Sequence, residues 1–361
     1  MMSIYLHPHI NIVAVHDRNA DRMQRFARHH GLQAIKTYRE LLSLDEVDIV
    51  INLTNPHSHA EVTAAALRAG KHVYSEKPLA MTFEDGRELV ELAESKGLYL
   101  AGAPCTLLGP TAQTMWQALR TGVAGKVRAV YAELDEGLLH KFSYRKWISP
   151  SGNQWPFQDE FEVGCTIEHA GYCITWLLAM FGPARSVTAF SSILVDEKCQ
   201  EVPADHSAPD FSVACIHFEN GVVARLTNSI VAPHDHSFRI FGDNGTLYTQ
   251  ESWSMYAPVF FRKWMTIRRR TFLNPLRQKL RLLGRRLPRP ARGGSQEIDF
   301  ALGINDLIDA ISNGRPCRLN AQFALHVTEL ALAIDAAKEN SCTHVMQSTF
   351  EPIDPMPWAE V

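Results

Sequence analysis

The stretch from residue 47 to 78, VDIVINLTNPHSHAEVTAAALRAGKHVYSEKP, contains the alternation that decides the fold. An apolar run at 47–53 is followed by a helical segment at about 57–68 and a second apolar run at 72–75. Short apolar runs that alternate with helices predict a parallel sheet covered on both faces, because parallel strands need crossover connections. This stretch therefore predicts a doubly wound α/β domain.

The same alternation continues on both sides of that stretch. We expect strands at 10–16 and 98–103 and helices at 19–30 and 81–96, with Gly31 and Gly97 just past the helix ends. Residues 1–124 are thus predicted to form a Rossmann-type domain.

Past residue 125 the pattern changes to longer strands and tight turns. Turns at 219–221 and 243–245 contain Asn-Gly, which supplies the positive φ values of a hairpin. The strands are expected at 127–134, 187–195, 211–231 (a hairpin), 238–241 and 246–249, and the helices at 167–181, 298–312 and 322–338. We predict an α+β domain over 125–361 with a mostly antiparallel open sheet, which binds substrate and mediates oligomerisation.

Composition narrows the class of protein. With 46% hydrophobic and 21% charged residues, the chain can bury a substantial core. We find no signal-peptide pattern and no apolar run long enough for a membrane span, and expect a cytoplasmic protein. Seven cysteines without a C-x-x-C pair favour reduced thiols, and we expect no metal.

The basic charge is concentrated in one segment. Twelve of the 36 lysines and arginines lie within residues 262–292, whereas all 39 acids lie elsewhere. An acidic remainder argues against a specific nucleic-acid binder, but this basic insert could contact an anionic surface. We expect either a solvated loop or a docking arm, with a short amphipathic helix at 276–283.

Three loops at the predicted carboxyl edge of the parallel sheet carry polar side chains. Asp17 follows the first strand, where it could accept hydrogen bonds from an adenosine ribose or cap the next helix. Residues 54–59 open a helix whose N–H groups could face a cofactor or simply be capped. Glu76-Lys77-Pro78 ends the strand at 72–75. A lysine there must be paired or have a lowered pKa, and it could exchange a proton with a substrate hydroxyl.

Together these motifs resemble the Gfo/Idh/MocA (glucose-fructose oxidoreductase, inositol dehydrogenase, rhizopine catabolism) family. The resemblance rests on VHDRN, on T-N-P-x-x-H and on A-G-K-H-V-x-x-E-K-P, followed by an antiparallel domain. It implies that Lys77 is catalytic and that Asp17 accepts the ribose. It also implies that Arg18, Asn55, His57 and Glu76 lie along a nicotinamide cofactor.

Two departures from the family pattern stand out. The glycine-rich turn that lies about 20 residues before the ribose carboxylate has no counterpart ahead of Asp17, so we expect a shortened start that lacks the first strand. The family's Asp-x-Gly-x-His-x-x-Asp run corresponds to residues 168–175. Tyr172 then stands for the histidine and Thr175 for the last aspartate, with Glu168 and His169 as further substrate-binding candidates. A tyrosine, with a pKa of about 10, is a weaker base than histidine.

These features predict an NAD(P)-dependent oxidoreductase that acts on a hydroxyl-bearing carbon of a sugar, inositol or nucleotide sugar. Lys77 and Tyr172 are the expected catalytic residues. Asp17 favours NAD, because a 2′-phosphate would meet like charge, whereas Arg18 keeps NADP open. The family's architecture implies a dimer or tetramer. The alternative is a non-catalytic sugar-binding or regulatory protein that has lost the cofactor.

Overall fold

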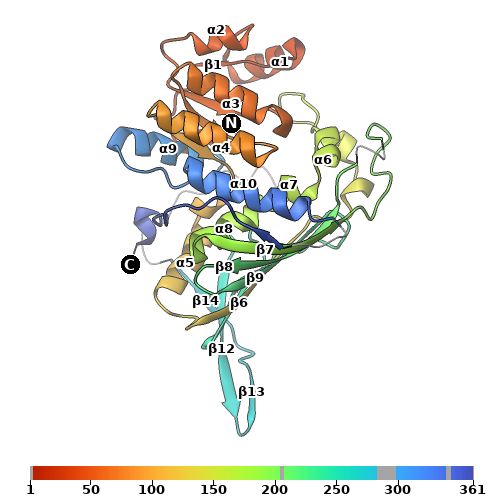
Figure 1. Ribbon diagram of the computed structural model, residues 1–361, viewed down its shortest axis with the longest axis vertical. Helices are drawn as coiled ribbons and strands as arrows, with labels where there is room; N and C mark the ends of the chain where they lie inside the picture. Colours follow the sequence, from red (N-terminus) through yellow and green to blue (C-terminus); the bar gives the residue numbers. More distant parts are fainter. Residues whose placement is uncertain (1–2, 204–206, 283–297, 339–342, 361) are drawn as a thin grey trace.

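A computed structural model describes residues 3–203, 207–282, 298–338 and 343–360 of the chain. The N-terminal domain lies at one end of the molecule and the large sheet of the second domain at the other (Figure 1). Both predicted fold classes are confirmed: an α/β Rossmann-like domain is followed by a large, mostly antiparallel open sheet.

The parallel strands of the N-terminal domain form two groups. β1 (Ala14–Val15) pairs with β2 (Gln33–Ala34), while β3 (Ile49–Asn52), β4 (His72–Ser75) and β5 (Leu100–Gly102) pair in that order. Within the described ranges, no ladder joins β1 to β3. The strand expected at 10–16 is only two residues long, since it is paired on one side alone.

Three helices of this domain match the predicted periodicity: α1 (Ala20–His30), α3 (His59–Arg68) and α4 (Phe83–Ser95). The short helix α2 (Tyr38–Leu42) was not predicted. Gly31 ends α1 with a φ of 67°, which favours glycine. Val50 and Val73 of the sheet pack with Leu67 and Leu89 of the helices, so the apolar faces of α3 and α4 cover the parallel strands.

The second domain is built on a ten-stranded sheet. Its strands are β6 (Val127–Asp135), β7 (Ala184–Ser192), β8 (Phe211–Phe218), β9 (Val223–Ser229), β10 (Phe238–Gly242), β11 (Gly245–Thr249), β12 (Val259–Ile267), β13 (Arg270–Leu273), β14 (Gln278–Leu280) and β15 (Thr343–Val345). The order is β13-β12-β11-β10-β6-β9-β8-β7-β15, with β14 also on β12. Only β6 and β9 pair in parallel among these ladders. Alternate residues of β8 are buried, as expected for a sheet with one covered face.

The remaining helices follow β5 in the sequence. They are α5 (Pro110–Arg120), α6 (Phe157–Val163), α7 (Cys165–His169), α8 (Gly171–Phe181), α9 (Ala301–Asn313) and α10 (Ala321–Asp335). α5 lies within the range 1–124 predicted for the first domain, but its apolar side chains pack in the core of the large sheet. The helix expected at 167–181 is divided into α7 and α8 at Ala170. Short 3-10 turns occur at Ile4–Leu6, Pro56–Ser58, Thr106–Leu108, Leu139–Lys141, Tyr144–Lys146 and Pro357–Ala359.

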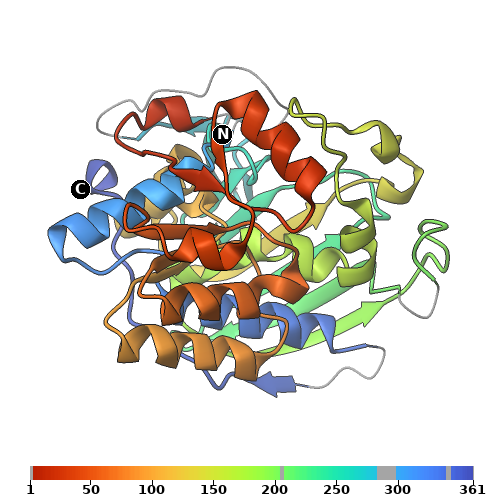
Figure 2. The same cartoon turned by 90° about the horizontal axis from the view of Figure 1, so that it is seen from above.

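Helix α10 connects the two hydrophobic cores. Its Ala324 and Leu325 pack with the N-terminal sheet, whereas Val327 and Leu330 pack with the large sheet. A Cβ at Gly102 would lie 2.7 Å from the Ala324 Cβ, so glycine permits this close approach. Seen from above, α10 runs beside α4 (Figure 2). The predicted 125–361 domain therefore also helps to cover the Rossmann-like sheet.

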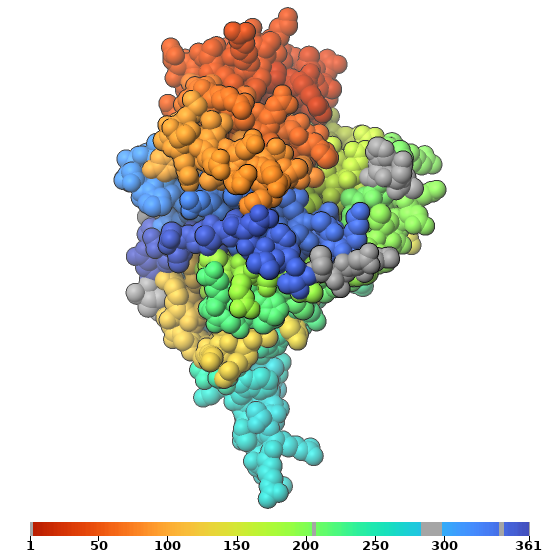
Figure 3. All heavy atoms as spheres, viewed as in Figure 1, coloured from red at the N-terminus to blue at the C-terminus, as the bar shows by residue number. Residues whose placement is uncertain are grey.

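The basic segment forms strands, not the predicted short helix. β12 continues past β11 into a hairpin with β13, and this hairpin projects from the body (Figures 1 and 3). Leu280 of β14 pairs with Val259 of β12. The helix expected at 276–283 is wrong because this strand pairing uses the same backbone groups. Residues 283–292 of the insert lie outside the described residues.

Across the described ranges, no helix is both long enough and apolar enough to cross a membrane.

Candidate active site

The centre of the candidate site is a buried ion pair between the two domains. Lys77 follows β4 of the N-terminal domain, and its Nζ donates to Glu168 Oε2 on α7 of the second domain. Each side chain is only 13% exposed. The carboxyl end of β4 therefore faces α7.

The pairing determines the charge state of Lys77. Burial alone would lower the pKa of Lys77, but the neighbouring carboxylate of Glu168, with contributions from Tyr172 and Glu76, raises it above its ordinary value. Burial raises the pKa of Glu168, and the Lys77 charge offsets part of that effect. Of the two alternatives for this lysine, the structure selects the paired one.

His59 is a site residue that the sequence analysis missed. Its Nδ1 lies 2.6 Å from the carbonyl oxygen of Pro78, and its Nε2 lies 2.9 Å from that of Thr54. The side chain is buried, whereas His57 is exposed. The ring thus ties the loop after β3 to the loop that carries Lys77. The spacing T-N-P-x-x-H pointed to this residue, since its histidine is His59 and not His57.

Tyr172 lies on the second-domain side of the ion pair. Its ring packs 4.6 Å from that of Trp253, and burial raises the pKa of Tyr172 above its ordinary value although the Lys77 charge opposes this. The Thr175 hydroxyl donates to the carbonyl oxygen of Tyr172 over 3.1 Å and is buried. The Thr175 hydroxyl therefore makes its hydrogen bond to the backbone of its own helix, α8.

His169 is held by a second acid. Its Nε2 lies 3.0 Å from Glu160 Oε1 on α6. Burial would lower the pKa of His169, but Glu160 and Glu136 raise it above its ordinary value. The other ring nitrogen, Nδ1, is buried without a hydrogen-bond partner. His169 thus supports the wall of the site through α6, directly after Glu168 in the chain.

Asp17 lies just after the carboxyl end of β1. Its carboxylate accepts from Arg22 Nε at 2.5 Å and from the backbone N–H of Asn19 at 2.8 Å. The cap of α1 is Asn19, which accepts from the Arg22 N–H, so Asp17 is not the helix cap. Burial would raise the pKa of Asp17, but Arg22 and the Asn19 N–H lower it, so the carboxylate stays charged. Arg18 is exposed beside it.

The loop after β3 connects to the second domain and presents an apolar surface. Asn55 Nδ2 donates to Asp159 Oδ1 over 3.4 Å. Leu53, at the end of β3, is 69% exposed, which is unusual for a large apolar side chain beside a buried strand. A planar cofactor ring can cover this surface. Glu76 accepts from the Lys77 N–H over 3.2 Å and remains half-buried at the same edge.

The residues at this edge fit the two ends of a nicotinamide dinucleotide. Asp17 offers a charged acceptor of the kind that can bind ribose hydroxyls, and Lys77 with Glu76 offers a charged group after β4. Between these ends, the described residues carry no glycine-rich turn next to a helix N-terminus, which is the usual pyrophosphate cradle.

Two family models match most of the chain. Residues 2–102 match the family model "Oxidoreductase family, NAD-binding Rossmann fold", and residues 112–248 match "GFO/IDH/MocA C-terminal domain". The chain belongs to the Gfo/Idh/MocA oxidoreductase family.

Its curated relatives are distant. A trans-1,2-dihydrobenzene-1,2-diol dehydrogenase from Bos taurus is 26% identical over 65% of this chain and 64% of that protein. The chain thus spans a little less than two thirds of that relative's length. A dTDP-3,4-didehydro-2,6-dideoxy-alpha-D-glucose 3-reductase from Streptomyces antibioticus is 25% identical over 84% of each chain.

Solved structures share the fold across nearly the whole chain. The 3-ketoreductase KijD10 from Actinomadura kijaniata, in complex with NADP and TDP-benzene, has a TM-score of 0.70 and 21% identity over 93% of this chain and 92% of that one. The WlbA dehydrogenase from Bordetella pertussis, in complex with NADH and UDP-GlcNAcA, has a TM-score of 0.68 and 17% identity, covering 95% and 93%. These structures show the fold of the present chain.

Proposed function

We propose that the protein is an NAD(P)-dependent oxidoreductase acting on a hydroxyl-bearing carbon of a sugar or nucleotide sugar. The observation that carries this proposal is the buried Lys77–Glu168 pair at the carboxyl end of β4, in a chain of an oxidoreductase family. The names of the relatives support the substrate class, since two of the matched proteins act on or bind nucleotide sugars.

The reaction divides into a hydride step and a proton step. Bound nicotinamide supplies the hydride acceptor, or the donor in the reverse direction. As the substrate carbon loses hydrogen with its electron pair, the hydroxyl oxygen must lose its proton to form the carbonyl. Lys77 is the proposed partner for that proton, because it is the basic side chain aimed out of the sheet edge.

Glu168 gives Lys77 a route to its free-base form. A protonated lysine cannot accept a proton, so the Lys77 proton must first move to Glu168, against the preference of the pair in the absence of substrate for the charged form. A bound substrate excludes water from the Lys77–Glu168 pair. Without water the two charged groups lose their solvation, so the neutral form of the pair is favoured. The hydroxyl proton then replaces the one that Lys77 has transferred.

The other predicted residues have supporting roles in this proposal. Tyr172 hydrogen-bonds the substrate oxygen as a neutral phenol, consistent with its raised pKa. Asp17 and Asn55 hold the cofactor, with the Asp17 charge favouring NAD and the exposed Arg18 allowing NADP. Glu168 acts through Lys77. We also expect a homo-oligomer, and light scattering at micromolar concentration tests this.

The deciding experiment is direct titration of the purified chain with NAD and NADP by calorimetry, followed by turnover with a panel of sugars and nucleotide sugars. A second version with a strand and glycine-rich turn added ahead of Met1 tests whether binding needs a ladder between β1 and β3. We expect nicotinamide binding and turnover in at least the second version. Binding of a sugar with no affinity for either cofactor in both versions would favour the non-catalytic alternative.

A further inference from the structure

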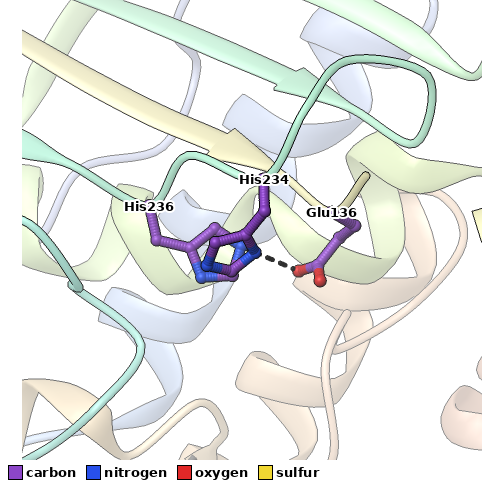
Figure 4. A group of neighbouring side chains, drawn as sticks. All are labelled: Glu136, His234 and His236. Atoms are coloured by element: carbon purple, nitrogen blue, oxygen red, sulfur yellow. Dashed lines mark ion pairs between the residues drawn. The ribbon is translucent and has the colours of Figure 1, made fainter. Parts of the chain in front are cut away.

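Two histidines and an acid converge beside the active site. Glu136 directly follows β6, and His234 and His236 lie in the segment between β9 and β10 (Figure 4). One potential ligand atom from each side chain lies within 4.8 Å of the others. These residues have no part in the proposed hydride and proton transfer.

The backbone holds the cluster in register. Asp135 and Asp235 exchange two backbone hydrogen bonds of 3.0 Å, which places Glu136 opposite the histidine segment. The carbonyl oxygen of His236 accepts from the Ser252 N–H over 2.9 Å. Because residues i and i+2 of an extended chain point to the same side, His234 and His236 face the same way.

Glu251 orients the two imidazoles. Its Oε1 lies 2.9 Å from His236 Nδ1, and its Oε2 lies 3.2 Å from His234 Nε2. A carboxylate on one ring nitrogen fixes the ring so that the other nitrogen can bind a metal, an arrangement common around metal-binding histidines. Here the second nitrogen of His236, Nε2, is directed towards Glu136.

The contact between Glu136 and His236 is a buried ion pair. Glu136 Oε1 and His236 Nε2 lie 3.2 Å apart, and both atoms are shielded from solvent. Two ligands of one tetrahedral zinc ion, each bound at about 2.0–2.1 Å, lie roughly 3.3 Å apart. The separation therefore suits two atoms that bind a common ion.

We propose that Glu136, His234 and His236 bind a divalent transition metal of the zinc type, with Glu251 as the carboxylate that orients the histidines. Imidazole nitrogen with carboxylate oxygen favours such ions over calcium or magnesium, which prefer oxygen alone. The two carboxylates balance the charge of a divalent cation when both histidines are neutral. His236 is almost fully buried, but the His234 side chain is 56% exposed and leaves a path for entry.

The site adjoins the proposed active site through one aromatic ring. Trp253 packs 5.1 Å from the His236 ring and 4.6 Å from the Tyr172 ring. Metal binding would brace the wall that carries Trp253. The inference does not rest on the dehydrogenase proposal, because its test measures the metal itself.

The test uses the full chain, freed of metal with a chelator and titrated with Zn²⁺ by calorimetry and with Co²⁺ by visible absorption. We expect one equivalent of each ion to bind, with the intense visible absorption of four-coordinate Co²⁺. His234→Ala should abolish this absorption, and Glu251→Gln should weaken binding by about 10–100-fold. His234 is exposed, so thermal unfolding in chelator should show that its variant folds like the parent chain.

The matched control is His29→Ala, which removes an exposed histidine on α1. It should leave both titrations unchanged. The proposal is overturned if the parent chain binds no stoichiometric metal, or if His234→Ala and His236→Asn both bind it as the parent does. Loss of binding in the control instead would place the metal at the surface histidines of α1.

Discussion

Lys77 and Glu168 come from different domains and are 91 residues apart in the sequence, yet they form one buried ion pair. Their contact requires both the turn after β4 and the placement of α7 against the sheet edge. A change in either residue should therefore affect both the chemistry and the contact between the domains, because it leaves the other charge buried without its partner.

Replacing Lys77 tests the proton-transfer role. Lys77→Ala should lower kcat by roughly two to four orders of magnitude, because a positioned acid or base contributes about that much. Cofactor affinity measured by calorimetry should change little. Lys96→Ala, which removes an exposed lysine at the end of α4, is the control. Unchanged turnover in Lys77→Ala would refute the assignment.

Replacing Glu168 tests how the pair sets the charge of Lys77. In Glu168→Gln the raising effect of the carboxylate is lost, and burial then lowers the Lys77 pKa. Because Lys77 must be unprotonated to accept the hydroxyl proton, we expect the acidic, ascending limb of the pH–rate profile for alcohol oxidation to move to lower pH. Glu162→Gln, at an exposed position on α6, should leave the profile in place. A shift to higher pH would contradict the proposed coupling.

His59 and His57 should differ sharply. His59→Leu leaves the carbonyl groups of Thr54 and Pro78 without their side-chain partner, which should cost about 1–3 kcal/mol of unfolding free energy. His57→Ala, at an exposed position, should change it by less than about 0.5 kcal/mol. Urea unfolding measures both. Equal effects would mean that His59 does not tie the two loops together.

The buried His326 side chain should make the folded protein less stable in acid. Burial lowers the pKa of His326 to about 4, and its Nε2 accepts the Ala184 N–H over 3.0 Å. The folded pKa is depressed below the unfolded value of about 6.5, so the stabilisation is present above pH 6.5 and is lost as the pH falls towards 4.

Between pH 7 and 5, this one group should reduce the unfolding free energy by about 2 kcal/mol. His326→Gln is expected to be less stable at pH 7 but to lose less on acidification. Parallel urea titrations of both proteins at the two pH values measure the difference. An identical pH dependence in the variant would exclude His326 as the source.

The β12–β13 hairpin should be dispensable for the fold. Its tip carries Arg268, Arg269 and Arg270 and projects from the body, so replacing residues 265–272 with Asn-Gly should leave the thermal midpoint nearly unchanged. If the hairpin docks on an anionic surface, the parent chain binds anionic vesicles at low salt and the shortened chain does not. Replacing the three arginines by glutamine removes the charge but keeps the hairpin, so this variant should also fail to bind the vesicles. Absence of vesicle binding by the parent chain would exclude the docking role.

The sequence by itself determined the two fold classes and most of their elements. The alternation of apolar runs and helices predicted both ends of β4 correctly, and Asn-Gly predicted both hairpin turns. Both signals could be read from the sequence because they depend only on neighbouring residues. Lys77 stood out because a charged residue follows a buried strand. The family resemblance then supplied its expected role.

Tertiary structure decided which side chains meet. The T-N-P-x-x-H spacing could not show that His59 is buried between two carbonyl groups, nor could local pattern show that Glu168 reaches Lys77. The short helix expected at 276–283 failed because pairing with β12 outweighed local amphipathic spacing. Likewise, Glu136 and His234 lie on separate segments whose approach depends on the order of strands in the sheet, which long-range packing fixes.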